Sequence, residues 1–425
     1  MSTRIELRLR LPLLWVAVLL VTAVFLPNRI WNTLLIGLGG LFVVAYWWVR
    51  TLKQGLTAQR RLRFGWVAVG DQLEELFEIT NKSLLPALWV QVMDQANVPG
   101  YRTAVVRSVG GGQVDRWRQT AVCQQRGQFH LGPWQLRTSD PFGIFRLIQD
   151  YPIANEIIIH PPIHGRLPVQ LPAGESSGRQ QVRQRTWQAT LNAATVRPYQ
   201  PQDPHKWIHW PISAHRGELF VRQFDEDASG DVWLVLDLQK DVQLGSGADS
   251  TEEQAVLLAA SLSARALRQN RAVGLAGYGQ QPQIVPPARG HGQQWQILRT
   301  LALMKANGPT NIDLALRDLG RLAQRGTTAV LITPNLAPDW LPSLLPLAQQ
   351  GIQSSVILLD RTSYGGTGSS TALQQAIRQL GFPCDILRRG QVGIPLQPQQ
   401  RRGFWEFRVT ASGRAVAVQQ PSNQP

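Results

Sequence analysis

The chain has 425 residues and a formal net charge of +15, although only 17% of its residues are charged. Because the excess comes from scarce acidic residues and not from a clustered basic face with interleaved aromatics, we expect no nucleic-acid binding, and the charge fits a surface that faces anionic lipid. The two cysteines, Cys123 and Cys384, are too few and too far apart for a disulfide framework and indicate a reducing compartment.

Two apolar stretches near the N-terminus predict membrane spans. Residues 11–27 and 30–49 contain no charged side chain. The second has about 20 residues, the length a helix needs to cross roughly 30 Å of hydrocarbon, and the first is near the lower limit. The short turn between them predicts an antiparallel hairpin within a domain at 1–53. A cleaved signal peptide is the alternative, but no small-residue cleavage site follows the first stretch.

Basic residues at the ends of the hairpin predict its orientation. They lie before the first stretch and after the second, whereas Arg29 alone lies between the two. The positive-inside rule therefore places both termini and the soluble domains in the cytoplasm of a multi-pass plasma-membrane protein whose first partner is the lipid bilayer. The flanking basic residues are Arg4, Arg8, Arg10, Arg50, Lys53, Arg60, Arg61 and Arg63.

Residues 54–165 predict a β-rich, sandwich-like domain. Short apolar runs such as 63–69, 76–79 and 88–92 are separated by glycine, asparagine and aspartate, and helical periodicity is absent. We expect about seven strands, the last at 156–160. No set of catalytic residues is present in this part of the sequence.

Residues 166–400 alternate between strand and helix patterns and predict an α/β domain with a mostly parallel sheet. Ligands of such sheets bind beyond the carboxyl ends of the strands, where Asp237 is expected to lie. Residues 401–425 predict a C-terminal strand and a disordered tail. The predicted strands are 231–237, 272–277, 329–333 and 354–360, and the predicted helices are 252–269, 295–305, 312–321 and 340–349.

A group of residues ahead of the first α/β strand, in a loop at 197–226, carries a family resemblance. Its members are Arg197, Tyr199, Asp203, His209, Trp210, Ser213 and Arg222. Together with the Asp-Pro-Phe-Gly-Ile-Phe segment at 140–145, they resemble the signature of a bacterial group known as domain-of-unknown-function family fifty-eight. The resemblance implies a von Willebrand factor A-like, Rossmann-type domain that binds protein partners, among them a MoxR-type AAA+ ATPase. It implies a partner and no reaction.

The resemblance also implies a Mg²⁺ site at the strand ends, built from an Asp-x-Ser-x-Ser loop, a distant threonine and a further aspartate. Here the loop has Gln239 and Asp241 at the serine positions after Asp237, with Lys240 between them, and Thr310 fits the threonine. Pro334 stands where the further aspartate is expected. Because Mg²⁺ requires near-octahedral oxygen ligation, we expect no cofactor, or at most weak Mg²⁺ binding.

His205, His209 and His215 invite a zinc hypothesis, but nearby prolines argue against one continuous helix and no cysteine completes a known spacing. We expect a structural role instead, with His209 and Trp210 packed between the signature loop and the sheet. Asp203 and Arg222 are their expected hydrogen-bonding partners.

Two functions remain in competition. The first is a non-catalytic membrane scaffold or adaptor whose cytoplasmic α/β domain binds a protein. It follows from the layout and from the absence of phosphate-loop, nucleophile-elbow and dinucleotide motifs. The alternative is a Mg²⁺-dependent enzyme that uses the strand-end carboxylates with Thr310.

Overall fold

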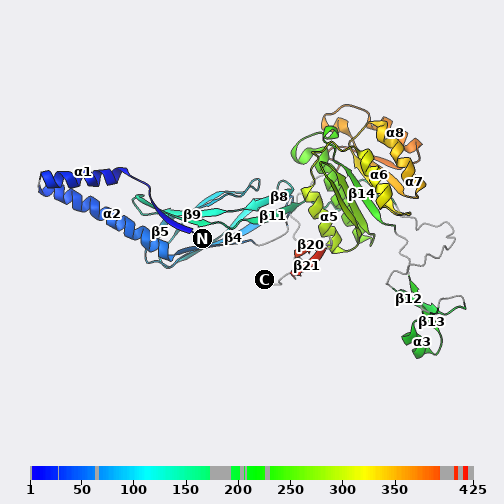
Figure 1. Ribbon diagram of the computed structural model, residues 1–425, viewed down its shortest axis with the longest axis horizontal. Helices are drawn as coiled ribbons and strands as arrows, with labels where there is room; N and C mark the ends of the chain where they lie inside the picture. The colour runs from blue at the N-terminus through cyan, green and yellow to red at the C-terminus, as the bar shows by residue number, and fades with distance from the viewer. Residues whose placement is uncertain are drawn as a thin grey trace.

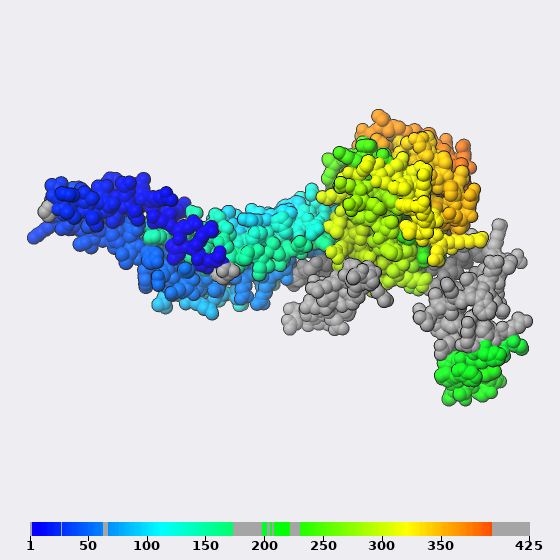
Figure 2. Space-filling model, in the orientation of Figure 1, coloured from blue at the N-terminus to red at the C-terminus, as the bar shows by residue number. Residues whose placement is uncertain are grey.

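The molecule has three parts that follow one another along its long axis: a pair of helices, a β domain and an α/β domain (Figures 1 and 2). The computed structural model describes residues 2–26, 28–62, 67–172, 193–201, 205, 208–224, 230–392, 406–409 and 415–419. The expected separation into a β-rich middle region and a C-terminal α/β region is visible in this arrangement.

The helix pair consists of α1 (Leu11–Phe25) and α2 (Arg29–Gly55), which lie side by side (Figure 1). Asn28 caps α2 by accepting a hydrogen bond from the backbone N–H of Ile30. Helix α2 is long and apolar enough to cross a membrane, whereas α1 has 15 residues. Most large apolar side chains of both helices are exposed, which distinguishes them from the core helices of a soluble domain.

Helix α2 continues past residue 49, where its span was predicted to end. Val49, Leu52 and Leu56, which begins the next strand, are buried in a core made with strands of the β domain. The last two turns of α2 therefore belong to the β domain, which prolongs the helix beyond the apolar stretch and fixes its direction.

The β domain contains three sheets, and its described strands outnumber the seven that we predicted. A five-stranded sheet has the order β1-β10-β9-β5-β6, and two three-stranded sheets have the orders β2-β4-β7 and β3-β11-β8. The number of strands was underestimated because short strands separated by turns are difficult to distinguish as individual apolar runs in the sequence. The strands are β1 (Ser2–Leu7), β2 (Leu56–Leu62), β3 (Val67–Ala68), β4 (Gln72–Asn81), β5 (Ala87–Asp94), β6 (Ala104–Val109), β7 (Val114–Val122), β8 (Gly127–Leu131), β9 (Trp134–Ser139), β10 (Phe145–Tyr151) and β11 (Asn155–His160).

Strand β1 was not predicted, because residues 2–7 were interpreted only as the basic flank of the first apolar stretch. The segment alternates between exposed and half-buried side chains and pairs antiparallel with β10, with Ile5 opposite Leu147. The chain thus enters the β domain before α1 and again after α2.

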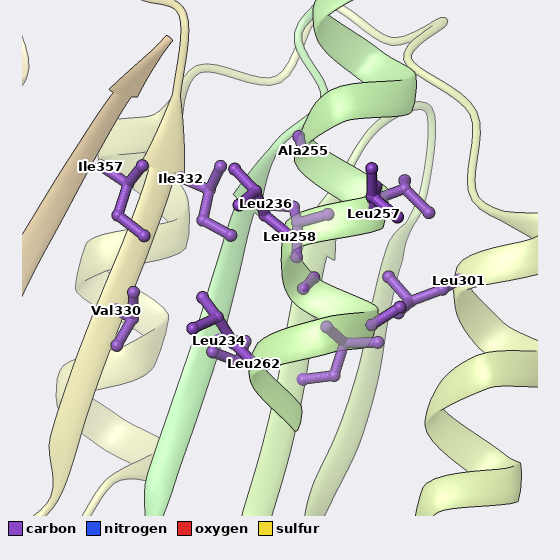
Figure 3. Packing of buried hydrophobic residues seen from close by; sticks show 14 of the residues in the cluster. Leu234, Leu236, Ala255, Leu257, Leu258, Leu262, Leu301, Val330, Ile332 and Ile357 are labelled. Atoms are coloured by element: carbon purple, nitrogen blue, oxygen red, sulfur yellow. The ribbon is translucent and has the colours of Figure 1, made fainter. Parts of the chain in front are cut away.

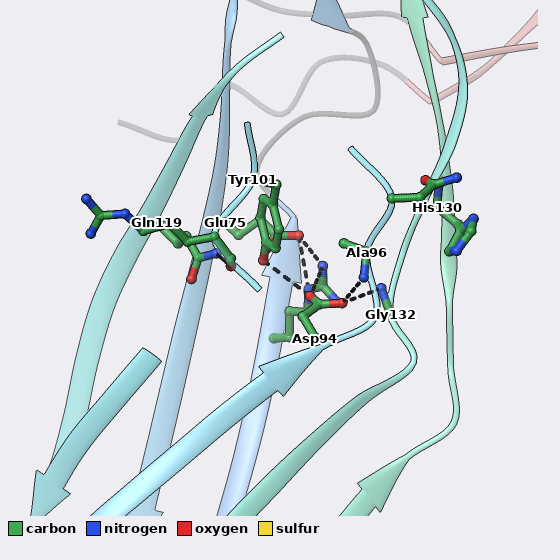
Figure 4. Close-up of polar contacts among 10 residues, drawn as sticks. Glu75, Asp94, Ala96, Tyr101, Gln119, His130 and Gly132 are labelled. Atoms are coloured by element: carbon green, nitrogen blue, oxygen red, sulfur yellow. Dashed lines mark hydrogen bonds and ion pairs between the residues drawn. The ribbon is translucent and has the colours of Figure 1, made fainter. Parts of the chain in front are cut away.

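A buried ionic network joins two sheets of the β domain (Figure 4). The Arg60 guanidinium from β2 donates to Glu75 Oε1 of β4 at 2.6 and 3.0 Å and lies 3.0 Å from Asp94 Oδ2 of β5. Tyr101 donates its hydroxyl hydrogen to Glu75, and burial, reinforced by the charge of Glu75, raises the pKa of Tyr101. The phenol therefore stays protonated as a donor. Asp94 also accepts the backbone N–H of Gly132 at 2.8 Å.

The α/β domain is built on a six-stranded sheet with the order β16-β15-β14-β17-β18-β19. Strands β14, β15, β17, β18 and β19 are parallel, and β16 is an antiparallel edge strand. The order places β14 at the centre, with β15 and β16 on one side of it and β17, β18 and β19 on the other. The strands are β14 (Val232–Asp237), β15 (Val273–Tyr278), β16 (Pro282–Ala288), β17 (Thr328–Thr333), β18 (Gln353–Leu359) and β19 (Cys384–Leu387).

Helices cover both faces of this sheet. Side chains of β14 alternate between the faces: Leu234 and Leu236 pack with α4 and α5, and Trp233 and Val235 pack with α6, α7 and α8. Figure 3 shows the first of these cores, in which side chains of α4 pack against those of β14. The helices are α4 (Thr251–Arg268), α5 (His291–Leu303), α6 (Ile312–Leu322), α7 (Leu344–Gln349) and α8 (Ser370–Gln379).

Several elements of this domain differ from the prediction. Strand β16 was missed because its sequence contains three prolines, which an edge strand tolerates since one side of its backbone needs no partner. Helix α8 and strand β19 follow β18 and lie beyond the last strand of the predicted alternation. The helix predicted at 340–349 divides into the 3₁₀ helix Pro338–Ser343 and α7, since Pro342 interrupts the α-helical pattern.

The β domain contacts the α/β domain through Arg126, in the turn between β7 and β8. Its nearly buried guanidinium lies 2.8 Å from Glu252 Oε1 and also pairs with Glu253, both in the first turn of α4. It donates to the carbonyl oxygens of Leu301 and Met304 at the end of α5, at 3.0 and 2.7 Å. One side chain thus ties the β domain to two helices of the α/β domain. A cavity of about 430 Å³ lies beside this contact.

The segment between the two domains also packs on the α/β domain. Val169 is buried in the core beneath α4, and its carbonyl oxygen accepts a hydrogen bond from Arg265 at 3.3 Å. The backbone N–H of His164 donates to Ser261 Oγ at 2.8 Å. Residues 161–172 are therefore part of the folded α/β domain.

Strands β20 (Glu406–Val409) and β21 (Ala415–Gln419) form an antiparallel pair near the C-terminus. The expected C-terminal strand is one of this pair. The rest of the expected tail lies outside the described residues.

Candidate functional site

The carboxyl edge of the six-stranded sheet, between β14 and β17, is where a sheet of this order offers a ligand site. Asp237 ends β14 and Thr333 ends β17, its parallel neighbour. Because parallel strands end on the same edge, two residues 96 positions apart in the sequence come into contact there. The sequence placed Asp237 at this edge correctly, and the contact with Thr333 was not foreseen.

The Asp237 carboxyl group is enclosed and fully hydrogen-bonded. Thr333 Oγ1 donates to Asp237 Oδ2 at 2.7 Å, and the backbone N–H of Gln239 donates to Asp237 Oδ1 at 3.1 Å. Asn335 N–H donates to Thr333 Oγ1 at 2.9 Å, which orients the hydroxyl toward the carboxyl group. Only 1% of the Asp237 surface is exposed, and burial raises its pKa to about 6 despite both hydrogen bonds.

The residues expected to hold Mg²⁺ do not converge around Asp237. Thr310 lies on the same edge, but its hydroxyl donates to the carbonyl oxygen of Gly279 at 2.9 Å. Asp241 is exposed, in the first turn of a 3₁₀ helix. The side-chain oxygen of Gln239 is buried without a hydrogen-bond partner in the described chain. One satisfied carboxylate and one amide oxygen do not fit the six-oxygen shell that Mg²⁺ demands.

The described part of the chain contains no cluster of three histidine, cysteine, aspartate or glutamate side chains that could hold a metal ion. Nor is the Asp237–Thr333 pair open to a substrate. A hollow of about 170 Å³ is lined by Leu238, Gly279 and Lys305 among others, and neither member of the pair lines it. The pair therefore acts as an internal link between two strand ends.

A second carboxylate at this edge was not singled out from the sequence. Asp360 follows β18, and its Oδ1 accepts hydrogen bonds from Thr362 Oγ1 and Ser370 Oγ, both at 2.8 Å. It thereby holds the loop after β18 against the first residue of α8. Its position directly after an apolar strand was the signal available, and it is the same signal that identified Asp237.

The signature residues fold into a small unit of their own. Strand β12 (Ala193–Pro198) pairs antiparallel with β13 (Phe220–Phe224), and helix α3 (Trp210–Arg216) lies between them in the sequence. His209 caps α3: its Nδ1 accepts the backbone N–H of Ile212 at 3.3 Å. Ser213 is buried and joins α3 to β13, since its hydroxyl donates to the His209 carbonyl oxygen and accepts the N–H of Phe220 at 2.9 Å.

These contacts give His209 and Ser213 structural roles and leave Trp210 outside the core. The Trp210 side chain is 65% exposed, so the expected packing of this residue against the sheet is not observed in the described chain. Tyr199 lies near His205, with 5.9 Å between ring centroids. In the β12–β13 pair, Arg197 lies opposite Val221 and Arg222 lies opposite Val196. Asp203 is outside the described residues.

Comparison with known proteins finds one family that is similar to this unit and to most of the sheet. Residues 195–362 match the family described as Protein of unknown function DUF58. The chain is 26% identical over 221 residues to the uncharacterised protein YeaD of Bacillus subtilis, covering 51% of this chain and 52% of YeaD. It is 28% identical over 169 residues to the uncharacterised protein Mb1516 of Mycobacterium bovis, covering 39% and 53%. The chain thus spans about half the length of these relatives.

Among solved structures, a von Willebrand factor type A protein from Catenulispora acidiphila aligns with 38% of this chain and 39% of its own, at 12% identity and a TM-score of 0.27. The strand order and helix placement described above, and not this alignment, define the fold. The match at residues 195–362 covers the signature unit and the central strands, and it makes this part of the chain similar to the family described as Protein of unknown function DUF58.

Proposed function

We propose that this protein is a membrane-anchored adaptor whose α/β domain binds another protein and performs no chemistry itself. The observation that carries the proposal is Trp210, a large aromatic side chain that is 65% exposed on a unit held in shape by His209 and Ser213. Tryptophan is enriched among the residues that dominate protein interfaces. Before its partner binds, a tryptophan that serves as an interface residue is exposed to solvent on an ordered part of the protein, as Trp210 is here.

The helix pair supports the membrane location. Helix α2 is long and apolar enough to span a bilayer, and the apolar side chains of α1 face outward beside it. Strand β1 precedes α1 and strand β2 follows α2, and both belong to the β domain. If α2 crosses the membrane, α1 must return across it. The basic residues at the β-domain ends of both helices favour a cytoplasmic side for the soluble domains.

The buried strand-end pair favours binding over catalysis. A catalytic carboxylate must reach the atom on which it acts, and Asp237 is enclosed with both oxygens accepting hydrogen bonds. The Mg²⁺-dependent alternative requires ligands that the described strand ends do not bring together. Asp237 instead links β14 to β17 through Thr333 and fixes the relative position of the two strands.

The partner we propose is a MoxR-type AAA+ ATPase, as the family resemblance implies. Replacing Trp210 with alanine is expected to reduce recovery of this ATPase at least 10-fold, because truncation of a central interface aromatic typically costs about 2 kcal/mol or more. The measurement is affinity capture of the tagged full-length chain from detergent-solubilised native membranes, followed by quantitative mass spectrometry of the captured proteins.

Leu345→Ala is the matched control, since Leu345 is an exposed apolar residue of α7. This variant is expected to recover the ATPase as well as the unaltered chain. Equal recovery with Trp210→Ala would remove Trp210 from the interface. Recovery of no ATPase above an untagged chain would overturn the partner assignment.

A further inference from the structure

Helix α1, and the part of α2 that extends beyond the β domain, are each shorter than the hydrocarbon core of a bilayer. Helix α1 has 15 residues, which at 1.5 Å per residue gives about 22 Å, whereas the hydrocarbon core is about 30 Å thick. On α2, the β domain begins beside Phe42 and Tyr46, whose rings lie 6.1 and 5.6 Å from the ring of Phe145. The part of α2 before this contact, residues 29–41, is therefore about 20 Å long.

A helix that is shorter than the hydrocarbon core requires local thinning of the bilayer or deeper insertion of the protein segments beside the helix. The β-domain loop at 140–144 lies at this position. Backbone N–H groups of Arg8 and Leu9, which immediately precede α1, donate to the carbonyl oxygen of Ile144 at 2.8 and 3.4 Å. The loop is thus attached to the chain where that chain enters α1.

The loop holds an aromatic side chain outward on a rigid turn. Buried Asp140 accepts the backbone N–H of Phe142 at 2.8 Å and that of Phe145 at 2.6 Å. Gly143 adopts a φ of +72°, a conformation that favours glycine, and its N–H donates to the Asp140 carbonyl oxygen at 3.1 Å. Phe142 is 50% exposed although both ends of its turn are fixed. Leu9, beside the loop, is exposed as well.

Charged side chains complete the surface. Arg8 and Arg10 are exposed on either side of Leu9, and in the described chain neither has an acidic partner. Guanidinium groups on long stems can reach lipid phosphates while an adjacent apolar side chain enters the acyl boundary. Aromatic and basic residues together are typical of the layer between hydrocarbon and water.

We infer that the 140–145 turn is a lipid-contact site, with Phe142 and Leu9 inserted at the headgroup boundary of the bilayer and Arg8 and Arg10 bound to anionic lipid phosphates. This inference rests on the membrane anchoring proposed above. In this inference, the Asp-Pro-Phe-Gly-Ile-Phe segment holds the β domain against the membrane surface. Its insertion compensates for the short free parts of α1 and α2.

The test uses the full-length chain with buried Cys123 and Cys384 replaced by alanine and one new cysteine that carries a polarity-sensitive fluorophore. Phe142→Cys reports on the loop. Ile153→Cys is the matched control, because Ile153 is 74% exposed and follows β10, whereas Phe142 precedes the same strand. Ile36→Cys, on the exposed face of α2, reports on the anchor. The chains are placed in vesicles of phosphatidylcholine and phosphatidylglycerol that contain spin-labelled lipid.

With the spin label near the top of the acyl chains, quenching of the fluorophore at position 142 is expected to exceed quenching at position 153 at least two-fold. The emission of the fluorophore at position 142 is also expected to shift to the blue. Equal, water-like signals at 142 and 153 combined with a lipid signal at 36 would overturn the inference and leave the anchoring intact. A water-like signal at 36 would overturn both.

The arginines are tested in the same chains. Quenching at position 142 is expected to fall when phosphatidylglycerol is omitted, and Arg8→Gln combined with Arg10→Gln is expected to remove this dependence. Quenching that does not respond to phosphatidylglycerol in the chain with both arginines would overturn their assignment to lipid phosphates.

Discussion

Replacing Arg60 with methionine is expected to lower the free energy of unfolding of the β domain by about 3 to 5 kcal/mol, the range for breaking a buried ion pair on one side. Arg60 is the cation of a network whose two carboxylates, Glu75 and Asp94, have nearly no solvent contact. Methionine fills a similar volume but leaves both carboxylates without their charge partner. Because Glu75 and Asp94 come from different sheets, we expect the loss to loosen the sheets relative to each other.

Hydrogen exchange of peptides from β4 and β5 measures this effect within the β domain alone. Arg61→Met is the matched control, since Arg61 is the next residue of the same strand and is exposed, and it is expected to change exchange very little. Adding Glu75→Gln to Arg60→Met is expected to recover part of the loss, because one uncompensated charge is removed. Equal effects of the Arg60 and Arg61 changes would show that the network contributes nothing to stability.

Replacing Asp237 with asparagine is expected to stabilise the α/β domain at pH 7 and to remove a pH dependence. Burial raises the pKa of Asp237 from 3.8 to about 6, so the folded state binds this proton more tightly than the unfolded state. The resulting stabilisation is complete below about pH 4 and is lost as the pH rises to about 6. A pKa shift of this size corresponds to on the order of 3 kcal/mol of folding free energy. This value is an upper limit for the gain in Asp237→Asn, because asparagine offers one hydrogen-bond acceptor fewer.

The free energy of exchange for peptides from β14 and β17, corrected for intrinsic exchange rates, gives the pH profile between pH 4 and 8. The unaltered chain is expected to lose stability across the lower half of this range, and Asp237→Asn is expected to give a nearly flat profile. Asp241→Asn is the control, since Asp241 is exposed nearby and its replacement should leave the profile unchanged. A flat profile in the unaltered chain would contradict the assignment of Asp237 as a buried group that ionises at a cost.

Part of the strand edge was predictable from the sequence. An apolar run that ends in a carboxylate indicated that Asp237 would lie at the carboxyl end of a parallel strand, and the structure places it there. Its partner Thr333 also ends an apolar run, but the strand order, which makes β14 and β17 neighbours, cannot be derived from local patterns. The Thr310 hydroxyl was assigned to the same site because its spacing fits, and its actual acceptor, the Gly279 carbonyl oxygen, is a backbone group that no motif encodes.

The N-terminal strand illustrates the same limit. Residues 2–7 contain two charged side chains among six residues and lie beside a strongly apolar stretch, so their alternating pattern was overlooked. Pairing with β10, about 140 residues later in the chain, makes this segment a strand. The consequence is functional, because β1 and the buried end of α2 fix both ends of the helix pair to one domain. A local description of the two apolar stretches could not provide that constraint.

The two domains are also joined more firmly than their sequences indicated. Arg126 binds the first turn of α4 and the end of α5, and residues 161–172 pack along the α/β core. The α/β domain is therefore held at a set distance from the helix pair instead of on a flexible tether. In the adaptor proposed above, this arrangement would hold the α/β domain at a fixed height above the membrane.

Protease accessibility in intact cells tests the central claim most directly, namely that the helix pair lies in the membrane with the β and α/β domains inside the cell. The account predicts that the full-length chain stays with membranes after high-salt washing, that its C-terminal half resists protease added outside intact cells, and that it is digested once the cells are permeabilised. Digestion of that half in intact cells, or a full-length chain that remains soluble without detergent, would contradict it.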